Sequence, residues 1–273
     1  MKWQLVIDVA EGHNCSNCVL AAKDEFVGND FPGYSAPHAA QGPGVIRIER
    51  HVRGHGHHVD AAFVPHLCNH CADAPCVKAG AGAVRQRDDG IVIFDPERTR
   101  GRRDLVEACP YGAVVWNEAE QLPQTWIFDA HLLDAGWKAP RCVTVCPTGA
   151  IEALKLDDAA MAERAEREGL RTLRAELGTK PRVHYRHLER ADRLFIAGSV
   201  VRGGDCAADV EVTLQPAAGP AQHTRTNDFG DFRFDGLAAG HYSVELQHAA
   251  GRAAREVRLE QESAVLPDIV FSP

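Results

Sequence analysis

The pattern of hydrophobic and polar residues changes near residue 193. After that position, short segments alternate apolar and polar residues and are separated by turn residues, among them Gly203–Asp205 and Asn227–Asp231. Alternation with a period of two predicts strands with one buried face. The predicted strands are residues 194–201, 209–216, 232–237, 241–248, 255–260 and 268–271. Six short strands at this spacing predict a small β-sandwich.

Residues 157–177 have a composition typical of a helix. Ala, Leu, Arg and Glu dominate the segment, Asp157 can cap its start, and Gly178 is a suitable stop. The polar segment TKPRVHYRHLERADR follows and is predicted to be a linker.

The sequence therefore predicts an α+β protein in three parts. A loop-rich domain covers 1–155, where Gly and Pro are frequent and long periodic segments are lacking. A helix and linker cover 156–192, and a β-sandwich domain covers 193–273. Metal sites can replace a large core in loop-rich folds such as the first of these parts.

Charge and hydropathy narrow the class of protein. The chain of 273 residues carries a net charge of −8, and its basic runs are short, which argues against binding to nucleic acid. No apolar stretch reaches the roughly 20 residues that a membrane-spanning helix needs. The N-terminus has neither the apolar core of a signal peptide nor a twin-arginine pair. We expect a cytoplasmic protein that binds neither nucleic acid nor membrane.

Cysteine is the residue type that points to chemistry. The chain has nine cysteines, and all except Cys206 lie before residue 150. Disulfides are disfavoured in the cytoplasm, so clustered cysteines there indicate metal or redox chemistry.

Four of these cysteines form a complete ligand set, called here the first thiolate set. Cys68, Cys71 and Cys76 share one loop, and Cys109 precedes Pro110. In two-cluster ferredoxins, three ligands come from one run and the last from a distant Cys-Pro. The first thiolate set therefore predicts a [4Fe–4S] cluster. A structural zinc ion is the alternative, although zinc ribbons favour two paired C-x2-C knuckles.

Three further cysteines form an incomplete set, called here the second thiolate set. Cys15 and Cys18 are spaced C-x2-C, and Cys146 precedes a proline. Gly12 stands where one more C-x2-C step would place another ligand. Three thiolates could hold a [3Fe–4S] cluster, a [4Fe–4S] cluster completed by His13 or water, or no cluster. Cys142 could instead join them in a zinc site.

Together these segments resemble the iron–sulfur subunits of the dimethyl-sulfoxide-reductase-type molybdopterin oxidoreductases. The segments that carry the resemblance are VIDVAEGHNCSNCVLAAKDEF, HLCNHCADAPCVKAG, GIVIFDPERTRG, EACPYGAVVWNE and QTWIFDAHLLDAGWKAPRCVTVCPTGAI. The resemblance implies a ferredoxin-like double [4Fe–4S] domain over roughly the first 155 residues. It also implies a large catalytic partner subunit that carries the molybdopterin cofactor.

The chain departs from the pattern of four cysteine runs at several positions. Gly80 replaces one ligand, and residues 96–108 contain no cysteine, so the resemblance implies that one cluster is lost. Trp126 and Asp129 stand at two more ligand positions, and Ala22 stands at their remote partner. That leaves Cys142 alone in what we call the degenerate site, defined by Ala22, Trp126, Asp129 and Cys142.

Within this family, the chain most resembles the small subunits of pyrogallol–phloroglucinol transhydroxylase and of resorcinol hydroxylase. The segment ELGTKPRVHY and the C-terminal β-sandwich contribute to this likeness. The resemblance implies an electron-transfer subunit of a cytoplasmic enzyme that acts on phenols, with no catalytic residue in this chain. The alternative is a scaffold subunit whose residual sites only stabilise the catalytic partner.

Two other segments have simpler interpretations. Histidines 51, 55, 57, 58 and 66 match no standard zinc spacing, so we expect a loop that docks a partner rather than a metal site. The segment TNDFGDFRFDGLAAGHYSVEL resembles carboxypeptidase-regulatory-like or prealbumin-like β-domains, with Phe232 and Phe234 facing the core.

Overall fold

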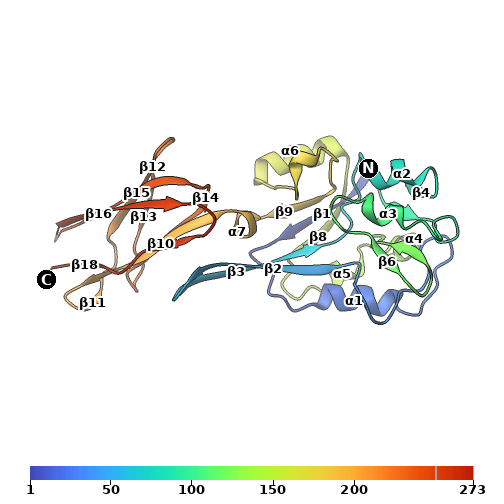
Figure 1. Cartoon of the computed structure of the whole chain (residues 1–273), viewed down its shortest axis with the longest axis horizontal. Coiled ribbons are helices and arrows are strands. Elements are labelled where there is room, and N and C mark those ends of the chain that lie inside the picture. The colour runs from blue at the N-terminus through green and yellow to red at the C-terminus, as the bar shows by residue number, and fades with distance from the viewer. Residues whose placement is uncertain (250, 273) are drawn as a thin grey trace. The chain divides into compact units, whose positions relative to one another are not determined.

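The computed structural model describes residues 1–249 and 251–272 and divides the chain into two compact units (Figure 1). The cysteine-rich unit comprises Met1–Glu49 and Phe63–Leu188, and the sandwich unit comprises Arg50–Ala62 and Glu189–Pro273. Each unit is described by itself below.

A three-stranded sheet lies at the centre of the cysteine-rich unit. Strand β1 (Lys2–Asp8) pairs with β8 (Ile151–Leu156) antiparallel and with β9 (Val183–Arg186) parallel, so the three strands lie side by side (Figure 1). Apolar residues along β1 are almost fully buried, as expected for a central strand covered on both faces. Helix α6 (Asp158–Glu168) contributes Met161, which packs against Val6 of β1.

Loops and short elements build the rest of this unit. Helix α2 (Pro75–Gly80), strands β4 (Val84–Gln86) and β5 (Val92–Phe94), and helix α3 (Asp104–Glu107) surround a core that includes Leu105. The remaining elements are α1 (Asn17–Phe26), β6 (Val115–Asn117), β7 (Leu122–Gln124), α4 (Ala130–Asp134), α5 (Arg141–Thr144) and the 3-10 turn η1 (Ala175–Leu177).

The predicted helix 157–177 is shorter than expected, and the predicted linker is ordered. Asp157 caps α6 as expected, because its carboxylate accepts a hydrogen bond from the Ala160 N–H at 2.8 Å. The helix ends at Gly169, whose φ of 63° is left-handed, rather than at Gly178. The segment VHYR then forms β9, because its Val and Tyr side chains are buried against the sheet.

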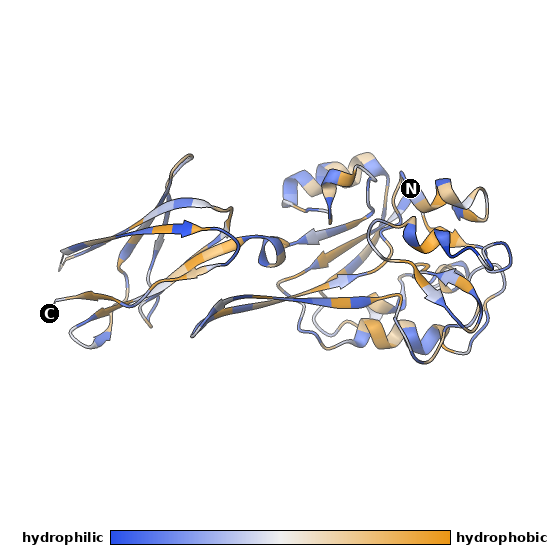
Figure 2. Cartoon of the chain, viewed as in Figure 1, coloured by the Kyte–Doolittle hydropathy of each residue, from blue (hydrophilic) through white to orange (hydrophobic). Residues whose placement is uncertain are grey.

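The sandwich unit contains two sheets that enclose one core. One sheet has the order β11-β10-β14, with β17 and β18 pairing with β10, and the other has the order β13-β12-β15-β16. The strands are β10 (Leu194–Arg202), β11 (Asp205–Cys206), β12 (Glu211–Pro216), β13 (Gln222–Arg225), β14 (Asp231–Leu237), β15 (Gly240–His248), β16 (Gly251–Leu259), β17 (Ala264–Val265) and β18 (Ile269–Phe271). The predicted C-terminal β-sandwich is confirmed, and Phe232 and Phe234 lie in its core. Buried and exposed residues alternate along β14 and β15, whereas β10 is apolar over most of its length (Figure 2).

The tip of a hairpin from the first part of the chain belongs to the sandwich unit. Strands β2 (Arg47–His55) and β3 (His58–His66) form this hairpin, and its residues 50–62 cluster with the sandwich, together with helix α7 (Glu189–Asp192). The unit boundaries therefore differ from the predicted boundaries at 155 and 193. The histidine-rich segment, expected to be a loop, forms this strand pair. Docking of a partner at this segment stays a prediction.

Charged side chains attach the hairpin tip to the sandwich. The Arg53 guanidinium donates hydrogen bonds to Asp60 at 2.6 Å and to Asp235 at 2.8 Å, and it lies over the Phe195 ring. Burial opposes ionisation of Asp60, but hydrogen bonds from Arg190 and Arg53 hold the pKa of this carboxyl well below its usual range. Separating these ions would leave a buried charge without a partner, which is strongly unfavourable. The network therefore fixes the position of the hairpin tip.

We predict that Gly54→Ala strongly destabilises the sandwich unit. Gly54 has a φ of 77°, and an added Cβ would clash with the His58 carbonyl oxygen and the Phe195 ring. Strain plus overpacking should lower the free energy of unfolding by about 2–4 kcal/mol. Gly56→Ala is the matched control, because Gly56 is also left-handed (φ 62°) but has open space around it, so about 1 kcal/mol is expected. Equal losses in urea titrations followed by circular dichroism would contradict the packing argument.

Candidate metal centres

The first thiolate set lies around the core of α2, β4, β5 and α3. Cys68, Cys71 and Cys76 are buried, each with 8% of its surface exposed, and Cys109 is partly buried. Cys71 and Cys76 are members of this hydrophobic core, and Cys109 packs against it. The short hairpin of β4 and β5 and the turn after α3 therefore bring together cysteines that are up to 41 residues apart.

The segment before β9 holds the loop that carries Cys71. The Ala72 N–H donates to the Lys180 carbonyl at 2.8 Å, and the Asp73 N–H donates to the Thr179 carbonyl at 3.0 Å. The Arg182 guanidinium donates to the His70 carbonyl at 3.0 Å. Sequence reasoning missed these supporting residues, because the GTKPRV segment that contains them has the composition of a linker.

Burial sets the protonation of the first thiolate set. Burial, followed by the charge of neighbouring thiols, raises the pKa of Cys68 and Cys71 above the usual thiol range and that of Cys76 to about 12. The thiols raise one another's pKa, so they lie close to one another. A metal replaces these protons, because the thiolate is the ligand. The soft, all-sulfur donor set therefore fits an iron–sulfur cluster.

The second thiolate set lies at the end of the central sheet. Pairing of Ile7 with Ile151 places the loop after β1 beside the loop before β8, so Cys15 and Cys18 come close to Cys146. Cys15 is exposed, Cys18 is buried, and Cys146 is partly buried.

Two thiols of this set have pKa values shifted in opposite directions. Burial raises the pKa of Cys18, and the neighbouring thiols add to the shift. Burial also opposes ionisation of Cys146, but a hydrogen bond with the Thr148 side chain and hydrogen bonds from backbone N–H groups lower the pKa of Cys146 on balance.

The possible additional ligands of the second set lie in different surroundings. His13 is exposed, whereas Cys142 is buried and interacts electrostatically with Cys18 and Asp129. Gly12 has no side chain to offer, and a Cβ there would lie 3.1 Å from the Phe63 carbonyl oxygen.

Gly80, at a lost ligand position, is closely packed. A Cβ added to Gly80 would lie 2.6 Å from both Cβ and Cγ2 of Val84, which is buried in β4. The space that a side chain at position 80 would need is therefore occupied by Val84.

The four residues of the degenerate site are all buried. Trp126 is fully buried, Asp129 is 2% exposed, and Ala22 and Cys142 are also enclosed. Neither the Trp126 indole nor the Asp129 carboxylate is a soft ligand of the kind that iron–sulfur clusters use, and Ala22 has no donor atom in its side chain.

His70 lies between the first set and the degenerate site. Its Nδ1 accepts a hydrogen bond from the Val92 N–H at 3.0 Å, so the ring proton is on Nε2. Burial lowers the pKa of His70 to about 3, which keeps the imidazole neutral. The ring centroid lies 5.6 Å from that of Trp126. The HLCNHC motif contains His70, but the sequence did not predict that its neutral ring packs against Trp126.

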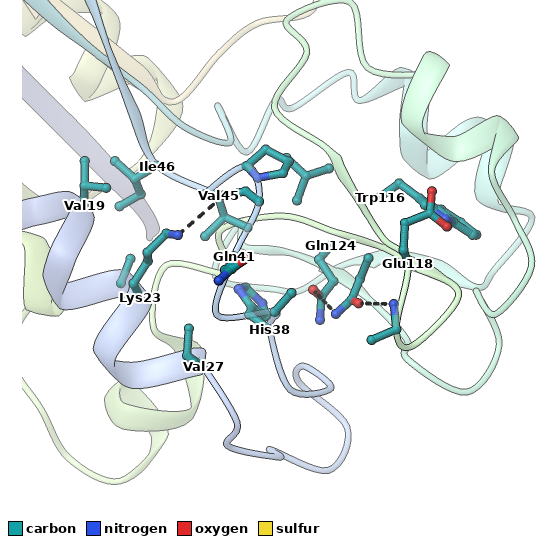
Figure 3. Close-up of a pocket in the computed structure, with 18 residues that line it drawn as sticks. Val19, Lys23, Val27, His38, Gln41, Val45, Ile46, Trp116, Glu118 and Gln124 are labelled. Carbon is teal, nitrogen blue, oxygen red and sulfur yellow. Dashed lines mark hydrogen bonds between the residues drawn. The ribbon is translucent and has the colours of Figure 1, made fainter.

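A cavity of about 300 Å³ opens beside α1 (Figure 3). Val19 and Lys23 extend from α1 toward it, and His38 and Gln124 lie around it (Figure 3). The Lys23 ammonium donates to backbone carbonyls, at 3.4 Å to that of Ala40. Among the residues of the degenerate site, Ala22 lines this cavity, whereas Trp126, Asp129 and Cys142 do not.

Comparison with known proteins identifies the family. The family model for the 4Fe-4S dicluster domain matches residues 59–156. The pyrogallol hydroxytransferase small subunit of Pelobacter acidigallici is 42% identical over 248 residues, which cover 90% of each chain. The chain belongs to the iron–sulfur small subunits of the molybdopterin oxidoreductases. The predicted resemblance is thus confirmed.

Other relatives of this small subunit span the same family. A tetrathionate reductase subunit from Salmonella typhimurium is 31% identical over 70% of this chain and 74% of its own. The arsenate respiratory reductase iron-sulfur subunit ArrB of Shewanella sp. is 30% identical over 51% of this chain and 55% of its own. Residues 194–268 match the second β-sandwich domain of NOMO1-like subunits of the BOS complex. The small subunit thus combines an iron–sulfur domain with a β-sandwich.

Two features are absent from the described part of the small subunit. Within residues 1–249 and 251–272, no three His, Cys, Asp or Glu side chains converge as they would around a single metal ion. In the same part of the chain, no helix has the length and apolar character that a membrane span requires.

We predict that Gly80→Ala lowers the free energy of unfolding by about 1–3 kcal/mol, because the new methyl group overpacks against Val84. The same substitution in a Val84→Ala background should lose part of that cost, since the clash with the Val84 Cγ2 methyl is gone while the contact with its Cβ remains. Chemical denaturation of the four proteins in this double-mutant cycle measures the coupling. Additive losses would show that position 80 is not limited by Val84.

We also predict that acid weakens the cysteine-rich unit through two half-buried, neutral histidines. Burial lowers the pKa of His38 and of His184 to about 4, below the ordinary value of 6.5. The unfolded chain therefore binds more protons as the pH falls from 6.5 to about 4, and stability is lost in that window. His38→Gln should remove up to roughly 3 kcal/mol of this loss. Chemical denaturation of the wild type and of His38→Gln at pH 7 and pH 4.5 measures the stability that each loses in acid. The same loss in both proteins would contradict the role given to His38.

Proposed function

We propose that this chain is the iron–sulfur electron-transfer subunit of a heteromeric molybdopterin enzyme that acts on phenols, by hydroxylation or by transfer of a hydroxyl group. The observation that carries the proposal is the buried, all-cysteine first thiolate set in a chain that is 42% identical, over 90% of its length, to a pyrogallol hydroxytransferase small subunit. The chemistry on the substrate resides in the large partner subunit, which carries the molybdopterin cofactor.

Cys68, Cys71, Cys76 and Cys109 would hold a [4Fe–4S] cluster. When bound, such a cluster accepts and returns single electrons. The residues of this chain supply the setting: Thr179 and Arg182 hold the loop around Cys71, and the hydrophobic core beside Cys71 and Cys76 keeps water away. Burial of this kind is one of the factors that set a cluster's reduction potential.

Cys15, Cys18 and Cys146 would hold a second cluster with three cysteine ligands, of the [3Fe–4S] or [4Fe–4S] type. The support is their proximity at the end of the central sheet and the Cys-Pro at Cys146. The exposed Cys15 leaves one side of this site open to solvent or to a partner.

The cysteine usage supports a cytoplasmic location. All nine cysteines are free thiols in the structure, and eight of them lie in the cysteine-rich unit. Free thiols persist where the compartment is reducing.

The sandwich unit would be a prealbumin-like or carboxypeptidase-regulatory-like module. Its support is the Asn227 turn, where the side-chain oxygen accepts the Asp231 N–H at 2.9 Å, and the Tyr242 hydroxyl, which donates to the Ala238 carbonyl. We assign it a stabilising or docking role toward the large subunit.

A scaffold role is the second candidate, and close packing at lost ligand positions favours it. Gly80 faces Val84, and Trp126 fills a ligand position. In this case the remaining metal sites would hold the fold without exchanging electrons with the catalytic subunit.

Cys76→Ser distinguishes these functions. We expect the anaerobically purified complex to lose about four irons and the matching acid-labile sulfide, together with a substrate-responsive paramagnetic signal. Cys206→Ser, an exposed thiol in the sandwich unit, is the control and should retain both. A wild-type protein that contains zinc, or whose cluster does not respond to substrate or reductant, would support the scaffold role instead.

A further inference from the structure

The degenerate site has exchanged its ligands for packed side chains. Its position in the sequence pattern corresponds to a complete cluster site, yet only Cys142 retains a thiol. Trp126 is fully buried and occupies one ligand position, and Ala22 at the remote position has no donor atom.

Aromatic rings fill the space around Trp126. The Trp126 centroid lies 4.8 Å from that of Phe128 and 5.6 Å from that of His70, and Phe128 lies 5.5 Å from Trp3. These distances are those of directly packed rings. Because protein interiors are close-packed, a group as large as a cluster cannot share this volume.

Asp129 stands at a ligand position but binds the backbone of a neighbouring helix. Its carboxylate accepts a hydrogen bond from the Arg141 N–H at 2.7 Å, which satisfies a donor at the start of α5. Helix α5 carries Cys142 and leads to Cys146 of the second thiolate set. The residue that replaces a ligand therefore supports the neighbouring set.

The degenerate site lies between the two thiolate sets. On one side, His70 comes from the loop between Cys68 and Cys71 and packs against Trp126. On the other side, the Cys142 thiol interacts electrostatically with Asp129 and with Cys18 of the second set. A cluster at this place would have bridged the two sets.

We propose that the degenerate site holds no cluster, and that packed side chains fill the place where a further cluster would have linked the two thiolate sets. The inference rests on the proposed function, because it takes the two thiolate sets to hold clusters. It deepens that function by assigning this chain two cluster sites with no cluster between them.

Cys142→Ser in the anaerobically purified complex tests the absence of a cluster. We expect its iron and sulfide content to equal that of the wild type, whereas Cys76→Ser should lose about four irons. A loss of iron in Cys142→Ser that adds to the loss in Cys18→Ser would show that Cys142 binds a cluster apart from the second thiolate set and would overturn the inference. Failure of the proposed function has a different signature, because Cys76→Ser would then leave the iron content unchanged.

The triple variant Ala22→Cys, Trp126→Cys and Asp129→Cys tests whether packed side chains have taken the place of a cluster. It restores four thiols at the degenerate site, and we expect a gain of about four irons over the wild type. A wild type that already contains the iron of three clusters, about twelve atoms, would overturn the inference. Trp126→Phe is the matched control, since it keeps a ring without adding a ligand and should leave the iron content unchanged. If the triple variant does not fold, the iron contents of the wild type and of Cys142→Ser still decide.

Discussion

Strand β1 is the element on which both thiolate sets depend. Its antiparallel pairing with β8 brings the loop of Cys15 and Cys18 to the loop of Cys146. Its parallel pairing with β9 positions the residues before Val183, whose carbonyls hold the loop that follows Cys71. Cysteines far apart in the sequence therefore meet because three short strands share one sheet, and residues outside the cysteine motifs decide where the thiols lie.

Loss of a ligand is accompanied by closure of the space around it. Val84 fills the volume that a side chain at Gly80 would need, and Trp126 packs into an aromatic stack. An unfilled void would have cost contacts on all sides, so apolar packing has taken the place of the ligand at these two positions. Ala22, the remote ligand position, instead lines the cavity beside α1. The packing around a missing ligand is thus a better guide to a cluster's absence than the missing cysteine alone.

The sequence pattern was sufficient for some levels of the structure and insufficient for others. Period-2 alternation predicted the β-sandwich, and the spacing of Cys68, Cys71 and Cys76 with a remote Cys109 predicted a ligand set whose members lie around one core. The course of 179–186 could not be predicted, because a short polar segment that contains a proline has the composition of a linker. Its pairing partner β1 lies at the other end of the unit's sequence, and local periodicity carries no information at that range.

The hairpin tip was missed for a related reason: Arg53 lies in a polar, Gly-containing segment, and its partner Asp235 comes from a strand far along the chain. Buried polar networks have no sequence period, so they escape pattern reasoning even where they determine how a segment is attached.

Electron transfer and scaffolding are not independent roles for this chain. Cys71 and Cys76 are core residues of the cysteine-rich unit, and burial raises the pKa of both thiols, to about 12 for Cys76. Without a metal these side chains are small neutral groups in a core with few long elements; with a metal, distant segments are joined through its ligand bonds. The binding free energy of the cluster is then also folding free energy. The first thiolate set consequently stabilises the unit in either role, and only its response to electrons separates the two.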